Sequence, residues 1–180
     1  MQAPEDVLKF WFVDHGRDDW FGGKPEFDAK LAAQFSATHE RIAAGEGYAW
    51  RHSPEGRLAE IIVLDQFSRQ LYRGSPKAFA SDGMALVLAQ ELVAQGLDQA
   101  LTPTQRTFVY LPYEHAESLA MQLQSVRLFQ ALGMEETTKF ARWHLEVIQR
   151  FGRFPKRNKA LGRESTPEEL AYIESKEHSF

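Results

Sequence analysis

The sequence predicts an all-α protein of about eight helices with no sheet. Four positions place a hydroxyl residue directly before a proline, which is the pattern of a helix N-cap followed by the first helical residue. No stretch alternates apolar and polar residues between hairpin turn signals, so no strand is expected. The four capping pairs are Ser53-Pro54, Ser75-Pro76, Thr102-Pro103 and Thr166-Pro167.

The expected helices follow one another with short connections. Two caps extend to capping boxes, Thr102 with Gln105 and Thr166 with Glu169, because the third residue on can bond back to the cap. Glycines at positions 45, 74, 96, 133 and 152 stand where helices are expected to stop. The helices are expected near residues 4–14, 25–44, 54–72, 76–95, 103–111, 113–132, 135–151 and 167–177.

The 180 residues, 1–180, are expected to form a single domain of ordinary size. Short connections favour an antiparallel array of helix pairs. No repeat of fixed length recurs, so a superhelical stack and a compact bundle both fit the pattern. The run Phe108–Leu111 has strand propensity, but the capping box before it and the helical pattern after it favour a helix.

Composition and charge exclude several classes of function. The chain is 43% hydrophobic and has no cysteine, which excludes disulfides, zinc–thiolate sites, iron–sulfur clusters and thiol nucleophiles. The longest apolar run, Met84–Ala89, is far too short for a membrane span. The net charge of −4 argues against nucleic acid or an anionic membrane as a partner. The N-terminus lacks the regions of a secretion signal, so a cytoplasmic location is expected.

The helix expected at 54–72 carries two charges on its apolar face. Asp65 and Arg69 lie four residues apart with the acid first, the favourable order for a helical pair, and they share that face with Leu58 and Ile62. Charges that face a core must be paired or functional, because an unpaired buried charge costs several kcal/mol. A structural ion pair and a role in a ligand site both fit this pattern.

The helix expected at 113–132 carries a polar stripe on an apolar face. His115, Ser118 and Gln122 fall on this stripe, and Pro112 is expected to begin or kink the helix and so to aim His115 into a cleft between helices. Buried donors and acceptors require partners. The stripe indicates either a polar pocket or satisfied core residues.

The helix expected at 135–151 carries His144 on a stripe with Phe140 and Val147, which is typical of a core histidine. No Glu-x-x-His, His-Glu-x-x-His or Gly-x-Ser-x-Gly motif occurs, and neither does a phosphate-binding glycine loop. The spacing of Asp65, His115 and His144 does not support a shared metal. We therefore expect no metal and no cofactor.

The sharpest charge feature is the run Val147–Arg163, which contains six Lys or Arg residues and no acid. A solvated surface loop is the ordinary explanation of such a run. Arginine outnumbers lysine in it, however, and arginine is suited to bidentate contacts with carboxylates and phosphates. The run therefore also fits an anion-binding segment.

With these residues in place, the chain resembles the bacterial domain-of-unknown-function 924 family over nearly its whole length. The stretch from Arg150 to Arg163 is the most specific part of the resemblance. The matching runs are Val7–Phe12, Trp20-Phe21, Leu64–Phe67 with Arg69, Tyr72–Gly74, Ala78–Ala80 with Asp82, Tyr110–Pro112 with His115 and Glu117, Gln122, Arg150–Pro155, Arg157-Asn158, Leu161–Arg163 and Ser165-Thr166.

The resemblance implies an all-helical fold similar to tetratricopeptide arrays, and no established activity. Ser68 and Gln70 depart from the family's usual proline and asparagine, Glu114 and Ala116 from methionine and serine, and Lys156 from a common histidine. A hydroxyl or imidazole at those positions is therefore not essential here. The candidates that remain are Asp65, Arg69, Arg73, Asp82, His115, Glu117, Gln122, Arg153, Arg157, Asn158 and Arg163.

Three functions fit these observations. The first is a polar pocket between helices, walled by residues 150–163, that binds a small anionic ligand through Asp65, Arg69, Arg73, His115, Gln122, Arg153, Arg157, Asn158 and Arg163. The second is a helical-repeat-like scaffold that binds an acidic peptide or a partner protein. The third is an enzyme with His115 as an acid–base catalyst and Asp65 or Glu117 orienting it.

Overall fold

A computed structural model of the chain describes residues 1–175, 177 and 178. Helical segments make up 78% of the structure, and the described residues contain no strand, so the all-α prediction is confirmed. Eleven α-helices are found in this part of the chain, somewhat more than expected. The difference arises mainly from short helices such as Arg17–Trp20 and Asn158–Leu161, which are too short to show a hydrophobic period.

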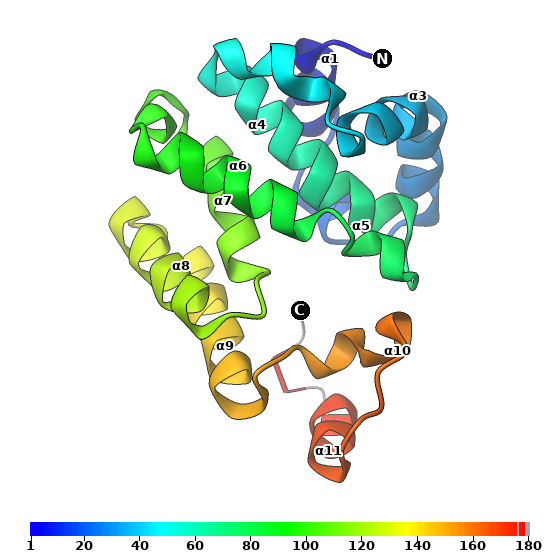
Figure 1. The fold of residues 1–180 in the computed structure, drawn as a ribbon, viewed down its shortest axis with the longest axis vertical. Coiled ribbons are helices and arrows are strands. Elements are labelled where there is room, and N and C mark those ends of the chain that lie inside the picture. The colour runs from blue at the N-terminus through cyan, green and yellow to red at the C-terminus, as the bar shows by residue number, and fades with distance from the viewer. Residues whose placement is uncertain (176, 179–180) are drawn as a thin grey trace.

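The helices follow the chain with short connections (Figure 1). They are α1 (Pro4–Lys9), α2 (Arg17–Trp20), α3 (Pro25–Ala43), α4 (Pro54–Ile62), α5 (Ser68–Leu71), α6 (Asp82–Ala94), α7 (Pro103–Glu114), α8 (Leu119–Leu132), α9 (Glu135–Phe151), α10 (Asn158–Leu161) and α11 (Pro167–Ser175). Two segments are π-helical, η1 (Phe10–Asp14) and η3 (Val63–Phe67). Four are 3₁₀-helical, η2 (Glu46–His52), η4 (Pro76–Ala78), η5 (Leu97–Ala100) and η6 (Pro155–Arg157).

The capping signals begin helices where they were expected. At α7 the Thr102 hydroxyl accepts from the Gln105 amide, and the Gln105 side chain accepts from the Thr102 amide at 2.9 Å. Thr166 and Glu169 form the second capping box at the start of α11. Ser75 also caps a helix, but it begins the 3₁₀ turn η4 rather than a long α-helix, and α6 starts only at Asp82.

The core has two parts. The larger part is formed by side chains from the elements between α1 and α9, and its biggest fully buried side chains include Trp11, Phe35, Phe67 and Phe108. A smaller cluster joins the end of α9 to η6 and α11 through residues Val147, Ile148, Phe154 and Tyr172. In Figure 1 the segments from α1 to α7 fill the upper part of the view, and α10 and α11 lie below them. None of the helices described is both long and apolar enough to cross a membrane.

The junction of α7 and α8 differs from the expectation. Pro112 lies inside α7, His115 is the C-cap of that helix, and α8 begins only at Leu119 after the N-cap Ser118. The expected helix 113–132 with a continuous polar stripe is therefore wrong. The Gln122 side-chain amide donates to the carbonyl oxygens of Glu114 and Ala116 at 2.6 and 2.8 Å, and so satisfies groups that the end of a helix leaves without partners.

Candidate functional site

Asp65 lies in the π-helical segment η3, within an otherwise continuous helical run from α4 to α5. A π-turn inserts an extra residue into an α-helix, and such turns are found frequently at functional sites. The side chain is only 1% exposed. A buried carboxylate at this position must be held by charged or hydrogen-bonding partners.

Three side chains hold the Asp65 carboxylate. The Nδ1 atom of His115 is 2.7 Å from Oδ1, and Nη1 of Arg69 is 3.1 Å from the same oxygen, so the predicted Asp65–Arg69 pair is confirmed. The Gln66 amide donates to Oδ2 at 2.5 Å. Burial by itself would raise the pKa of Asp65, but the Arg69 charge and the contact with His115 hold this pKa below its usual range.

His115 presents an open ring nitrogen. Since Asp65 is ionised, Nδ1 carries the proton and donates it to the carboxylate, which leaves the lone pair of Nε2 available. Within the described residues Nε2 makes no hydrogen bond, and the side chain keeps 14% of its surface exposed. Burial and the nearby Arg69 charge lower the pKa of His115, so the ring is a neutral base.

Asp82 bridges two arginines from distant parts of the chain. It accepts a bidentate pair of hydrogen bonds from Arg69 at 2.9 and 3.0 Å, but the nearest contact of Arg157 is longer, at 3.4 Å. Arg157 also donates to the backbone carbonyl of His115 at 2.9 Å. Its guanidinium carbon lies 4.7 Å from the ring centre of Phe79 and 4.6 Å from that of Phe154. Both distances are within the range of a cation–π contact.

The environment of Arg157 is short of negative charge. Burial and the Arg69 charge lower the pKa of Arg157 to about 10, despite the attraction of Asp82 and Glu117. An arginine with a lowered pKa is one whose charged form is incompletely compensated. An added anion would supply the missing charge.

Glu114 and His144 form a second carboxyl–imidazole contact beside the first. Oε1 of Glu114 lies 3.3 Å from Nδ1 of His144, and the His144 and His115 ring centres are 6.3 Å apart. Burial and the Asp65 charge raise the pKa of Glu114 to about 8, and burial lowers the pKa of His144 to about 3. Both groups are therefore neutral at pH 7.

We call these seven side chains the polar cluster: Asp65, Arg69, Asp82, Glu114, His115, His144 and Arg157. The cluster joins η3, α5 and α6 to the end of α7, to α9 and to η6. It therefore lies where the larger core meets the C-terminal segments.

Sequence reasoning missed part of this cluster. Glu114 stood out only as a departure from the resembled family, and nothing in the pattern showed that it is buried. His144 was interpreted as a core histidine, and it is indeed only 7% exposed, but its contact with Glu114 was not foreseen. The one available signal for His144 was a polar residue on the buried face of the helix 135–151.

Other candidates turn away from the cluster. Arg73 pairs with Asp28 at 2.9 Å, and Gln122 is fully buried with its amide committed to the end of α7. Glu117 does not orient His115. It accepts from Arg163 and from the Phe154 amide, both at 2.7 Å, and so fastens the start of the C-terminal segment to the α7–α8 junction.

Arg157 is the one residue of the basic segment that these contacts place in the cluster. Arg153 donates to both carboxylate oxygens of Glu169, at 2.6 and 2.8 Å. Arg163 binds Glu117 in a bidentate manner and also donates to Asn158 at 2.9 Å. We call these five side chains the C-terminal network: Glu117, Arg153, Asn158, Arg163 and Glu169.

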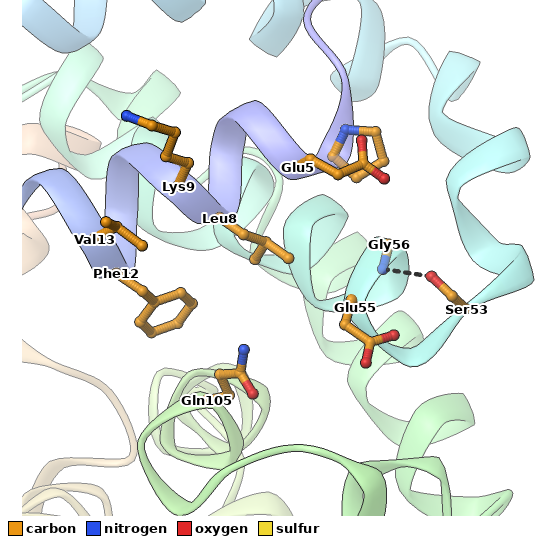
Figure 2. Close-up of a pocket in the computed structure, with 10 residues that line it drawn as sticks. Glu5, Leu8, Lys9, Phe12, Val13, Ser53, Glu55, Gly56 and Gln105 are labelled. Atoms are coloured by element: carbon orange, nitrogen blue, oxygen red, sulfur yellow. Dashed lines mark hydrogen bonds between the residues drawn. The ribbon is translucent and has the colours of Figure 1, made fainter.

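Two surface hollows lie elsewhere. Figure 2 shows the first, of about 510 Å³, where Leu8 and Phe12 of the N-terminal helical run face Glu55 and Gln105. The second, of about 550 Å³, is lined by α8 and α9 residues that include Trp143. Neither hollow is lined by a side chain of the polar cluster. Solvent reaches the cluster at its partly exposed side chains, which include Arg69, Asp82 and Arg157. The described residues contain no group of three or more His, Asp or Glu arranged to hold a metal ion.

Comparisons with known proteins place the chain in a family without a known function. None of the curated proteins compared with the chain matches it. A solved structure of a protein of unknown function from Agrobacterium tumefaciens is 38% identical, covers 96% of this chain and 97% of its own, and superposes with a TM-score of 0.91. The model of a family described as a bacterial protein of unknown function, DUF924, matches residues 7–177. The chain therefore belongs to the DUF924 family of bacterial proteins.

Proposed function

We propose that the protein binds a small anion, with a carboxylate or phosphate group, at the polar cluster. The observation that carries the proposal is the state of Arg157. Its guanidinium lies against the rings of Phe79 and Phe154, its nearest carboxylate is 3.4 Å away, and its pKa is lowered to about 10. A bound anion would restore the missing negative charge and complete the hydrogen bonding of this fork.

Neighbouring groups support this site. Arg69 adds a second positive charge with 20% of its side chain exposed, and His115 offers a neutral ring nitrogen next to it. A ligand could therefore be bound by charge at one end and by a neutral acceptor at the other. Such convergent polar groups are typical of small-molecule sites.

A thermal-shift screen of phosphorylated metabolites, dicarboxylates and acidic peptides tests the proposal. A ligand present at 100 times its dissociation constant should stabilise the fold by about 2.7 kcal/mol. The shift should vanish in Arg157→Leu and persist in Arg150→Leu. Arg150 belongs to the same basic segment, but it is 44% exposed and pairs with Glu168 outside the cluster.

Two outcomes would contradict the proposal. If no anion stabilises the wild-type protein, the site does not bind anions. If Arg150→Leu abolishes the shift as fully as Arg157→Leu, the anions respond to general surface charge. A preference for acidic peptides over small anions would instead favour the scaffold function.

A further inference from the structure

We propose that the polar cluster is also a proton-transfer site, in which His115 removes a proton from the carbon next to the carbonyl of a small 2-oxo carboxylate while Glu114 donates a hydrogen bond to the carbonyl oxygen. The inference rests on the proposed anion binding and names the class of ligand. It follows from three groups of different chemistry that lie together: a base, a neutral acid and a cation.

The base is the Asp65–His115 pair. The 2.7 Å contact fixes the ring orientation and keeps the proton on Nδ1, so that Nε2 is the atom that can accept a proton. When Nε2 does so, the adjacent carboxylate stabilises the imidazolium that forms. Arg157 binds the backbone carbonyl of the same histidine at 2.9 Å, so the anion-binding arginine and the base belong to one structural unit.

The acid is Glu114, which is 4% exposed. Burial raises the pKa of Glu114 to about 8, so the carboxyl keeps its proton at neutral pH. The His144 nitrogen nearest to Glu114, Nδ1, does not accept a hydrogen bond from the protonated carboxyl. Nδ1 of His144 lies 2.9 Å from the Phe140 carbonyl oxygen, which can only accept, so Nδ1 is itself a donor.

Among the hydrogen bonds and ion pairs of the described residues, the Glu114 carboxyl has only the 3.3 Å contact with Nδ1 of His144. Buried donors are almost always satisfied, by protein, water or ligand. A neutral imidazole base backed by an ionised carboxylate, beside a carboxylic acid that burial keeps neutral, is an arrangement that stabilises an enolate. The developing negative oxygen would accept the hydrogen bond that Glu114 offers.

These groups are continuous with the anion-binding arginine. Arg157 stacks on Phe154, and the Phe154 ring centre lies 5.5 Å from that of His144, which contacts Glu114. The carboxylate of the ligand would lie on Arg157, and its carbonyl group between the acid and the base. A small 2-oxo acid carries these two groups on adjacent atoms.

The reaction is balanced without an oxidant or a second substrate. The C–H bond breaks, its proton moves to Nε2 of His115, and its electron pair forms the carbon–carbon double bond of the enolate. Negative charge then develops on the carbonyl oxygen, which faces the Glu114 hydroxyl. In the reverse step the nitrogen returns a proton to the carbon, and this is a solvent deuteron when the reaction runs in D₂O.

Proton exchange in D₂O provides the test. The probes are pyruvate and 2-oxoglutarate, followed by the loss of their C3 proton signals in NMR spectra. Lactate and glutarate serve as control anions because they lack the 2-oxo group of these probes. The wild-type protein should accelerate exchange of at least one oxo acid above the protein-free rate, and His115→Asn should lower the catalysed rate on the order of 100-fold.

A matched variant separates the acid from the fold. Glu114→Met should fold, because the carboxyl makes a single 3.3 Å contact, with His144, and methionine is the residue usual at this position in the resembled family. It should retain the thermal shift with the oxo acid and lose most of the exchange. Arg150→Leu should keep both.

The possible failures are distinguishable. An oxo acid that stabilises the wild type through Arg157 but exchanges no faster than in buffer would overturn proton transfer and leave anion binding intact. Binding of other anions but of neither oxo acid would overturn the ligand class. Exchange at the wild-type rate in His115→Asn or Glu114→Met would overturn the assigned roles. If no anion binds at all, the proposed function itself fails.

Discussion

Two regions of this protein concentrate arginines and carboxylates, and they differ in how completely the groups are used. In the C-terminal network, Arg153 gives three hydrogen bonds, two to Glu169 and one to the Glu164 carbonyl. Arg163 gives four, two of them to Glu117. Each carboxylate of this network is matched by a guanidinium fork.

The polar cluster leaves three groups incompletely bonded. Within the described residues, Nε2 of His115 makes no hydrogen bond, the Glu114 carboxyl has a single 3.3 Å contact with His144, and Arg157 stands 3.4 Å from its carboxylate. Charged groups that satisfy one another stabilise a fold, whereas groups with remaining capacity are available to a ligand. Both regions pair arginines with carboxylates, so the remaining bonding capacity is the feature that distinguishes a candidate site from a structural network.

The largest effect is expected from the pH dependence of stability at Glu114. Folding raises the pKa of Glu114 from 4.5 to about 8, so between these values the folded chain holds a proton that the unfolded chain releases. Stability should therefore fall as the pH rises from 4.5 through 8, by roughly 4 kcal/mol. Urea titrations from pH 5 to pH 9 should show this loss in the wild type and its absence in Glu114→Met.

His144, His115 and Asp65 face Glu114 and also respond to pH. The pKa values of both histidines and of Asp65 are lowered by folding, so their contributions are lost toward acid rather than toward base. They do not account for a loss above pH 7. Identical pH profiles for the wild type and Glu114→Met would show that the carboxyl is ionised and that the cluster lacks a neutral acid.

The next effect is expected at Asp65. Replacement by alanine leaves Arg69 and His115 without their shared buried acceptor and should destabilise the fold by about 3 kcal/mol. The loss is placed at the lower end of the range for broken buried pairs because Arg69 keeps Asp82. Asp14→Ala, which removes an exposed pair with Lys9, should cost less than about 1 kcal/mol. An unchanged urea midpoint for Asp65→Ala would mean that the carboxylate does not stabilise the fold.

The fold and the site were predictable to different extents. Capping boxes such as Thr102 with Gln105 are local, and therefore they marked helix starts correctly. The π-turn at Val63–Phe67 has no comparable residue signature. Pro112 suggested a helix start or a kink because proline is favoured at the first helical position, whereas it lies inside α7. Asp65 and Arg69 could be paired from their spacing of four residues.

Contacts between distant residues could not be derived in this way. Asp65 and His115 are 50 residues apart. Each stood out on the face of its own expected helix, but nothing in the pattern showed that the two side chains touch. Arg157 and Arg163 stand in one basic run, yet one reaches the His115 carbonyl across 42 positions and the other reaches Glu117 across 46. Composition treats these two arginines as equivalent, and only the three-dimensional structure separates them.

The smallest effect on stability is expected at Arg163, and this substitution tests most directly the contrast between the C-terminal network and the polar cluster. Its side chain is 23% exposed and its charge is matched by Glu117, so Arg163→Ala should destabilise the fold by about 1–2 kcal/mol through lost charge-assisted hydrogen bonds. It should leave the thermal shift produced by a bound anion unchanged. Arg157→Leu should abolish that thermal shift. Its stability cost should stay small, because the loss of the 2.9 Å hydrogen bond to the His115 carbonyl is offset by removal of an incompletely compensated charge, while leucine still packs on Phe79 and Phe154. If Arg163→Ala instead abolishes anion binding at unchanged stability, the C-terminal network is the site and complete internal bonding does not identify a structural role.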